Sequence, residues 1–121
     1  MKTFASIAGA VAMLALCAAP CGAQDPATID PAHFKVELNN DRVRVLHVTV
    51  EPNAKVQLHE VGDAVVVPLK DYESTLKRPD GQVSVVERKT GKAAWLARGA
   101  REVEAGANGA DALLIEIKQA P

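Results

Sequence analysis

Apolar and polar residues alternate along most of this chain, and turn-forming residues interrupt the alternation at short intervals. In FKVEL (34–38) every second residue is apolar, and NND (39–41) then turns the chain. The next run, RVRVLHVTV (42–50), changes phase between Val45 and Leu46. A period of two is typical of β-strands, and a change of phase indicates either a bulge or a strand that is buried on both faces.

The later segments show the same short units. AVVVPL (64–69) predicts a buried strand, and Pro68 limits the pairing of that strand on one side. PDG (79–81) predicts a tight hairpin between two alternating runs, because Pro and Gly favour such turns. ALLIEIK (112–118) predicts the last strand. Eight or nine short strands without an amphipathic helical period predict an all-β sandwich or barrel.

The N-terminal segment, residues 1–23, indicates a secretory signal peptide. Lys2 gives it a positive start, and the apolar stretch IAGAVAMLALCAA (7–19) is shorter than the roughly 20 residues that a membrane-spanning helix needs. Small residues near its end favour cleavage between Ala23 and Gln24. We therefore expect a periplasmic or secreted protein.

The two cysteines of the chain lie inside this segment and would leave with it. The mature chain would then have no thiol and no disulfide, so its stability must come from its core. A lipoprotein is the competing interpretation, because Cys17 and Cys21 both lie near the end of the apolar run. Leu16 and Pro20 precede them, however, and both are poor residues for lipoprotein processing.

What remains after cleavage is enough for one domain and too little for two. The Pro-rich residues 24–33 are expected to form an extended arm, and residues 34–121 the domain itself. Loss of Lys2 leaves 13 of the 14 basic residues against 15 acidic ones, so the formal charge changes from -1 to -2. This charge does not favour nucleic acid, and no later segment suggests membrane insertion. We expect an unknown small molecule as the partner.

Four stretches of the chain, read in order, carry a resemblance to a known family. They are NDRVRVLHVTVEPNA (40–54), LHEVGDAVVVPL (58–69), PDGQV (79–83) and TGKAAWLARGAREVEAGANGADALLIEIK (90–118). In this succession the chain resembles a small single-domain member of the cupin superfamily over residues 36–118. The resemblance implies an antiparallel β-barrel of the jelly-roll type. It also implies two sequence motifs that in many cupins hold a divalent metal.

The metal-binding residues of these motifs are largely missing. His59 takes the place of the first histidine, whereas Val61 stands for the second and Val65 for the glutamate. In the second motif Glu102 replaces the third histidine. Two ligands completed by water would bind a divalent transition metal weakly, so we expect no metal cofactor. Without the ion, His59 and Glu102 are expected to face each other across the lumen.

This resemblance leaves three functions open. The first is a non-catalytic domain that binds a small molecule or a partner, with His59, Glu102, Val61 and Val65 around the lumen and Trp95 as the contact for a flat ligand. The second is a cupin-type enzyme, an isomerase or oxygenase with a weak metal site or a metal-free acid/base dyad of His59 and Glu102. The third is an oligomer-forming module, with a homodimer that covers an exposed edge of the barrel.

Overall fold

The computed structural model describes residues 25–119, and of residues 59–61 it describes the backbone only. The predicted signal peptide lies outside the described residues. The described part consists of one helical turn and nine β-strands, which confirms the predicted strand content. The elements are α1 (Pro26–Ile29), β1 (Phe34–Asn39), β2 (Val43–Val50), β3 (Lys55–Val61), β4 (Ala64–Pro68), β5 (Tyr72–Lys77), β6 (Val83–Arg88), β7 (Ala94–Leu96), β8 (Gly99–Ala105) and β9 (Ala110–Ile117).

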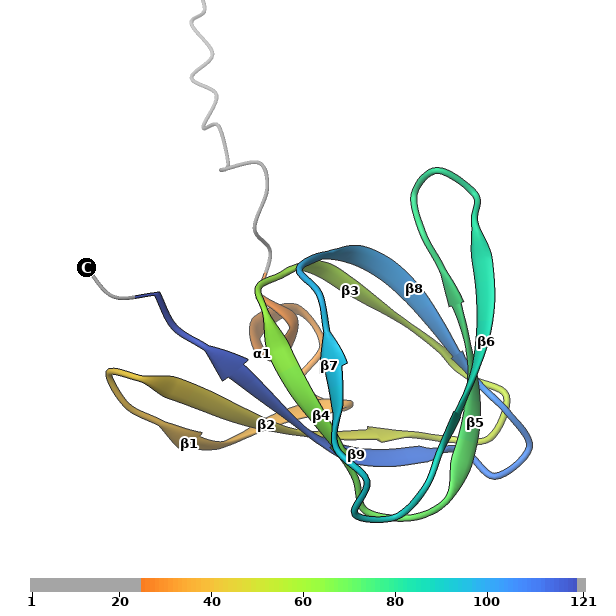
Figure 1. Cartoon of the computed structure of the whole chain (residues 1–121), viewed down its shortest axis with the longest axis horizontal. Coiled ribbons are helices and arrows are strands. Elements are labelled where there is room, and N and C mark those ends of the chain that lie inside the picture. The colour runs from red at the N-terminus through yellow and green to blue at the C-terminus, as the bar shows by residue number, and fades with distance from the viewer. Residues whose placement is uncertain (1–24, 120–121) are drawn as a thin grey trace, which may run out of the picture.

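The strands form two antiparallel sheets that face each other (Figure 1). One sheet has the order β1-β2-β9-β4-β7, and the other has the order β3-β8-β5-β6. Consecutive strands repeatedly belong to different sheets, so the chain winds around a common interior, as in a jelly roll. The predicted all-β barrel of this type is confirmed.

The predicted irregularity near Val45 and Leu46 is real, but it lies on the neighbouring strand. β2 pairs with β9 without interruption over its full length. In the pairing of β2 with β1, Val36 lies opposite Leu46 and Leu38 opposite Val45, so Glu37 is the extra residue of a bulge. β1 is an edge strand, where bulges are common because they terminate or redirect pairing.

The polar turns join the strands as their composition predicts. The Asn40 side chain accepts hydrogen bonds from the backbone of Arg42 and Val43, which closes the turn between β1 and β2. Gly81 has a φ of 92° in the PDG hairpin between β5 and β6. Gly109, with a φ of 72°, lies so close to the preceding turn that a Cβ would stand 2.6 Å from the Val50 carbonyl oxygen. No side chain fits there.

The N-terminal arm is not fully extended, because residues 26–29 form one turn of helix. Asp25 caps this turn and Pro26 occupies its first position, which is the arrangement that a helix start prefers. The prediction of an extended segment was wrong here. It was based on the Pro-rich composition and did not take account of Asp25 and Pro26 as the start of a helical turn. No helix in the described part of the chain is long and apolar enough to cross a membrane.

The core fills the space between the two sheets. Phe34 and Leu46 from the first sheet are almost fully buried, and Val56 and Leu58 from β3 face them. Two small residues of β9, Ala110 and Ala112, are buried and line the interior, where larger side chains would take up its space. The strand period of two therefore places one set of residues inside and the alternate set outside, and this choice decides which side chains can form a site.

Candidate functional site

A cavity of about 70 Å³ remains between the sheets. Its walls are mainly aliphatic and come from strands of both sheets, so the interior is lined largely by hydrocarbon. The polar groups on its wall are few. The lining residues are Phe34, Val48, Val50, Val56, Leu58, Val66, Tyr72, Ser74, Leu76, Val86, Arg88, Leu96, Arg101, Val103, Ala110, Ala112 and Leu114.

Arg101 is the charged residue that lies deepest in this wall. It belongs to β8, lies opposite Leu58 of β3 and is only 8% exposed. Its Nη2 donates hydrogen bonds to the backbone carbonyl oxygens of Ala97 and Gly99. Its Nε, by contrast, is buried and has no acceptor among the described atoms. One donor of a buried cation therefore has no partner within the described residues.

No carboxylate forms an ion pair with Arg101 among the side chains that the structure describes. Burial, and then the positive charge of Arg78, lower the pKa of the Arg101 guanidinium. Both causes act against the charged form, yet an arginine side chain keeps its charge at neutral pH. The cavity wall thus holds a cation that its described surroundings do not neutralise.

Two further polar residues face the cavity from β5. Ser74 is 4% exposed, and its hydroxyl has no hydrogen-bond partner among the described atoms. Burial raises the pKa of the Tyr72 phenol, so this group stays neutral. Arg88 lies directly opposite Tyr72 on β6 and also lines the cavity. Tyr72 and Arg88 are register partners near the end of the hairpin remote from its PDG turn.

Glu102, which the sequence motif placed in the lumen, lies on the outer face of its sheet. Its neighbours Arg101 and Val103 line the cavity and Glu102 does not, as the alternation of a strand requires. The Glu102 carboxylate accepts a hydrogen bond of 3.0 Å from Nε2 of Gln57, an exposed neighbour on β3. The expected position of Glu102 across the lumen from His59 is therefore corrected. Arg101 occupies the inward position instead.

Val65 and Trp95 also lie outside the cavity. Val65 of β4 pairs with Trp95 of β7 on one side and with Ile115 of β9 on the other. Trp95 is 60% exposed, and it is the next residue, Leu96, that lines the cavity. On β4, Ala64, one position before Val65, is fully buried, and Val66, one position after it, lines the cavity. Neither Val65 nor Trp95 can contact a ligand in the lumen from these positions.

The described residues do not fit the divalent metal that many cupins hold. The side chains of His59 and Val61 lie outside the described residues, and the other two motif positions hold outward-facing residues. In the remaining part of the described chain no three His, Cys, Asp or Glu side chains come together as metal ligands. Ala64 and Arg101, which face inward beside those two positions, offer a methyl group and a cation.

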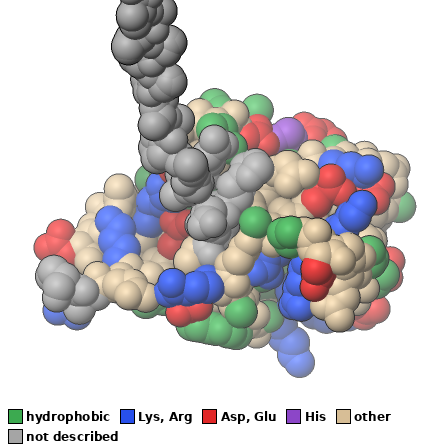
Figure 2. Space-filling model, turned by 90° about the horizontal axis from the view of Figure 1, so that it is seen from above, with side chains coloured by type: hydrophobic (Ala, Val, Ile, Leu, Met, Phe, Trp, Pro, Cys, Tyr) green, Lys and Arg blue, Asp and Glu red, His purple; other side chains and the backbone are tan. Residues whose placement is uncertain are grey.

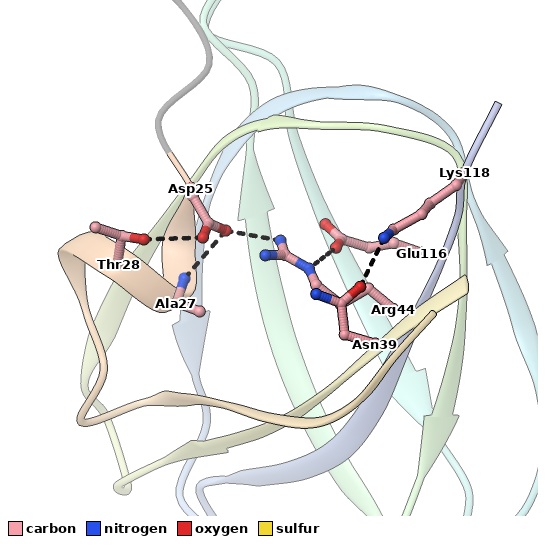
Figure 3. Close-up of polar contacts among 7 residues, drawn as sticks. All are labelled: Asp25, Ala27, Thr28, Asn39, Arg44, Glu116 and Lys118. Carbon is pink, nitrogen blue, oxygen red and sulfur yellow. Dashed lines mark hydrogen bonds and ion pairs between the residues drawn. The ribbon is translucent and has the colours of Figure 1, made fainter. Parts of the chain in front are cut away.

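A second arginine lies at the end of the interior that α1 covers (Figure 3). Arg44 of β2 donates from Nε to Glu116 at 2.6 Å and from Nη2 to Asp25 at 2.7 Å. Hydrogen bonds to these carboxylates, that to Asp25 foremost, raise the pKa of the guanidinium, and Arg44 lowers the pKa of Asp25 in turn. Thr28 adds a hydrogen bond to the same carboxylate. This cluster holds α1 against the sheet.

The two histidines with described side chains contact carboxylates outside the cavity. His33 uses its two ring nitrogens for Asp30 at 2.9 Å and Glu51 at 2.8 Å, and these contacts, Glu51 first, raise its pKa. His47 contacts Asp111 at 2.6 Å on the outer face of the first sheet. Neither residue takes part in the lumen.

The charges on the surface are mixed. On the face seen in Figure 2, acidic and basic side chains are interspersed, and hydrophobic side chains gather in small groups between them. The small net charge of -1 agrees with this distribution. No strong field of one sign covers the face in view.

Solved structures of other proteins share this architecture. A cupin domain from Bordetella pertussis Tohama I is 24% identical, with a TM-score of 0.63 over 71% of this chain and 92% of that chain. An RmlC-like cupin family protein with a double-stranded β-helix fold, from Methanocaldococcus jannaschii, is 15% identical, with a TM-score of 0.52 over 73% and 83% of the two chains. No protein-family model and no curated protein matches the chain.

The chain has the cupin fold, as its sequence resemblance indicated. An enzyme is among the similar structures: oxalate decarboxylase of Bacillus subtilis is 17% identical, with a TM-score of 0.51 over 65% of this chain and 22% of that one. At such identities the likeness concerns the fold alone. Because one fold hosts unrelated chemistries, the function has to be argued from the lumen.

Proposed function

We propose that this chain is an exported, non-catalytic binding domain whose lumen takes up a small molecule without a metal ion. The observation that carries the proposal is the cavity itself. It is walled by aliphatic side chains, and two buried polar atoms, Arg101 Nε and Ser74 Oγ, have no hydrogen-bond partner within the described part of the chain. Buried polar groups are normally paired, and those that are not mark places where a ligand or water completes the structure. An apolar pocket with few polar groups is the usual form of a small-molecule site.

Catalysis is not part of the proposal. The acid/base dyad considered from the sequence needs Glu102 inside the lumen, and this residue bonds to Gln57 on the outer face. A metal-dependent reaction would need a ligand set, and the inward-facing Ala64 and Arg101 do not contribute to one. Export is proposed on the anatomy of residues 1–23 alone, and the N-terminal sequence of the secreted or periplasmic product tests it.

Binding to the lumen can be tested with one filled and one matched variant. Ala112→Phe would fill the cavity, because Ala112 faces inward and is 5% exposed. Leu113→Phe adds an aromatic ring on the same strand, but this residue is not part of the cavity wall. Ligand-observed NMR with short-chain acids, amides and ketones should detect binding to the natural protein and to Leu113→Phe, and no binding to Ala112→Phe. Circular dichroism checks that both variants fold.

The metal-free part of the proposal has its own readout. Binding should be unchanged in EDTA, and elemental analysis of the purified protein should find no stoichiometric transition metal. Binding that disappears in EDTA and returns with a metal would overturn the proposal. So would binding that survives unchanged in Ala112→Phe.

A second candidate function, homodimer formation, is favoured by one observation. An apolar row runs over all five strands on the outer face of the first sheet. Its members, as given by the strand registers, are Leu38, Val45, Ile115, Val65 and Trp95. Two copies related by a two-fold axis would set hydrocarbon against hydrocarbon on this face. Sedimentation of the natural protein and of Trp95→Glu tests this candidate. A natural protein that is dimeric, with a variant that is monomeric, supports it, and a natural protein that is monomeric excludes it.

A further inference from the structure

The small molecule can be assigned a chemical class. Building on the proposed function of the lumen, we propose that its ligand is a short monocarboxylic acid, with the carboxylate bound by Arg101 and the hydrocarbon part lying against the aliphatic walls. Arg101 supplies both the charge and the geometry that such a ligand needs. It names a ligand chemistry that the cupin fold by itself does not supply.

The first step concerns the cost of burying the Arg101 guanidinium. A charged group taken out of water is stable only where it is paired and hydrogen-bonded. The carbonyl groups of Ala97 and Gly99 satisfy Nη2 in part, and Nε has no acceptor among the atoms that the structure describes. Arg78, which the register of β5 and β8 brings near, adds positive charge rather than removing it. An anion is the ligand that this position lacks.

The second step selects a carboxylate among anions. A guanidinium offers parallel N–H donors that match the two oxygens of a carboxylate, and such contacts are stronger than neutral hydrogen bonds. The rest of the wall near Arg101 is hydrocarbon: Leu58 lies opposite it on β3, and Val103 follows it on β8. An inorganic anion such as phosphate has oxygens on all sides. Those that do not contact Arg101 would lie against these apolar side chains without hydrogen bonds. An acid with an apolar body satisfies both parts of the site.

The third step limits the size of the ligand. A cavity needs about 10–15 Å³ to hold one water molecule. The cavity of 70 Å³ therefore has room for roughly five waters. An acid with about four carbons fills such a space. n-Butyrate is therefore the probe of choice, and n-butyramide is its uncharged counterpart with nearly the same shape.

Isothermal titration calorimetry of the full mature protein with both probes tests the proposal. Butyrate should bind at least about tenfold more tightly than butyramide, the difference expected for hydrogen bonds to a charged group. Arg101→Gln and Arg101→Met should lose this preference, and Arg101→Lys should keep part of it, because lysine retains the charge without the fork of donors. Arg88→Gln is the competing variant, since Arg88 also lines the cavity and lies opposite Tyr72 in the strand register. The matched control is Arg98→Gln, because Arg98 is an exposed arginine outside the cavity wall.

The outcomes separate this inference from the proposed function. Equal binding of butyrate and butyramide would overturn the carboxylate assignment and leave the lumen as a small-molecule site. Loss of butyrate binding in Arg88→Gln but not in the Arg101 variants would overturn the role of Arg101. Binding of neither probe, together with no binding of any small probe in the NMR screen, would overturn both.

One more variant tests whether a carboxylate of the chain itself, and not a ligand, neutralises Arg101. β3 carries Glu60 two residues beyond Leu58, the residue opposite Arg101. Under the proposal, Glu60→Gln binds butyrate as the natural protein does. Butyrate binding that appears only in Glu60→Gln would show that the chain neutralises Arg101 internally, and would overturn the proposal.

Discussion

Arg44 and Arg101 both extend from the inner faces of their sheets, yet their surroundings are opposite. Arg44 is 18% exposed and contacts two carboxylates, Glu116 on the adjacent strand and Asp25 at the start of α1. Arg101 is buried more deeply, and its hydrogen bonds to described residues all go to backbone carbonyl groups. The pKa of Arg44 is raised and that of Arg101 is lowered.

This difference separates a structural arginine from a binding arginine. The Arg44 cluster is complete within the chain, so its charges have no further need of a ligand. Arg101 lines the cavity, and no described side chain neutralises its charge. A buried charge without a partner reduces stability, and under the proposal the bound carboxylate supplies the partner that Arg101 needs.

The largest effect is expected from Arg44→Met. Removing this cation leaves the carboxylates of Glu116 and Asp25 close together without compensation. Unfolding free energy should fall by about 2–3 kcal/mol, somewhat less than for a fully buried pair because the cluster is partly exposed. Urea denaturation followed by circular dichroism measures the change. A variant as stable as the natural protein would show that the cluster does not anchor α1.

Arg101→Met should change stability in the opposite direction. The substitution removes an uncompensated cation and puts a flexible apolar side chain against an apolar wall. We expect unfolding free energy to stay equal or to rise by about 1 kcal/mol in ligand-free buffer. The same denaturation experiment gives the answer. A loss as large as that in Arg44→Met would mean that Arg101 is a structural residue, and the contrast between the two arginines would fail.

Acidification should affect the Arg44 cluster selectively. The folded pKa of Asp25 lies below its ordinary value of 3.8, mainly because of the hydrogen bond from Arg44. Stability from such a group is present above the unfolded pKa and is lost as pH falls through the folded pKa. Urea midpoints between about pH 2 and pH 5 should therefore fall more steeply in the natural protein than in Arg44→Met. Parallel profiles would contradict this account.

The smallest effect is expected at His33, which ties the segment after α1 to the turn after β2. Its pKa is raised, so its stabilising contribution is fully present below the unfolded pKa of about 6.5 and is lost as pH rises through the folded value. His33→Gln should thus lose stability below neutral pH and match the natural protein at higher pH. The thermal midpoints of the natural protein and of His33→Gln are measured along a pH series. A difference between the two midpoints that grows with rising pH would contradict the role given to His33.

The strands and the barrel could be predicted from the sequence because both follow from local alternation and turn chemistry. The site could not be predicted in the same way. The motif alignment selected Glu102 and Val65, each one residue away from an inward-facing position. In a strand, an error of one residue moves a side chain to the opposite face of the sheet.

One signal for Arg101 was present in the sequence. In REVEA (101–105), Val103 and Ala105 are apolar and alternate with two glutamates, which places Arg101 on the apolar face. In AVVVPL no such alternation exists, so the inward set could not be chosen there. The neutralisation of Arg44 was also beyond local patterns, because its partners Asp25 and Glu116 lie 19 and 72 residues away in the sequence.

One NMR experiment tests the contrast between the two arginines most directly. The side-chain Nε–Hε signals of Arg44 and Arg101 are followed together in ¹H–¹⁵N spectra while butyrate is added to the natural protein. The Arg101 signal should shift progressively as Nε gains an acceptor, and the Arg44 signal should stay in place as an internal control. A titration in which the Arg101 signal does not move, or in which both signals move alike, would contradict the assignment of Arg101 as the carboxylate-binding residue.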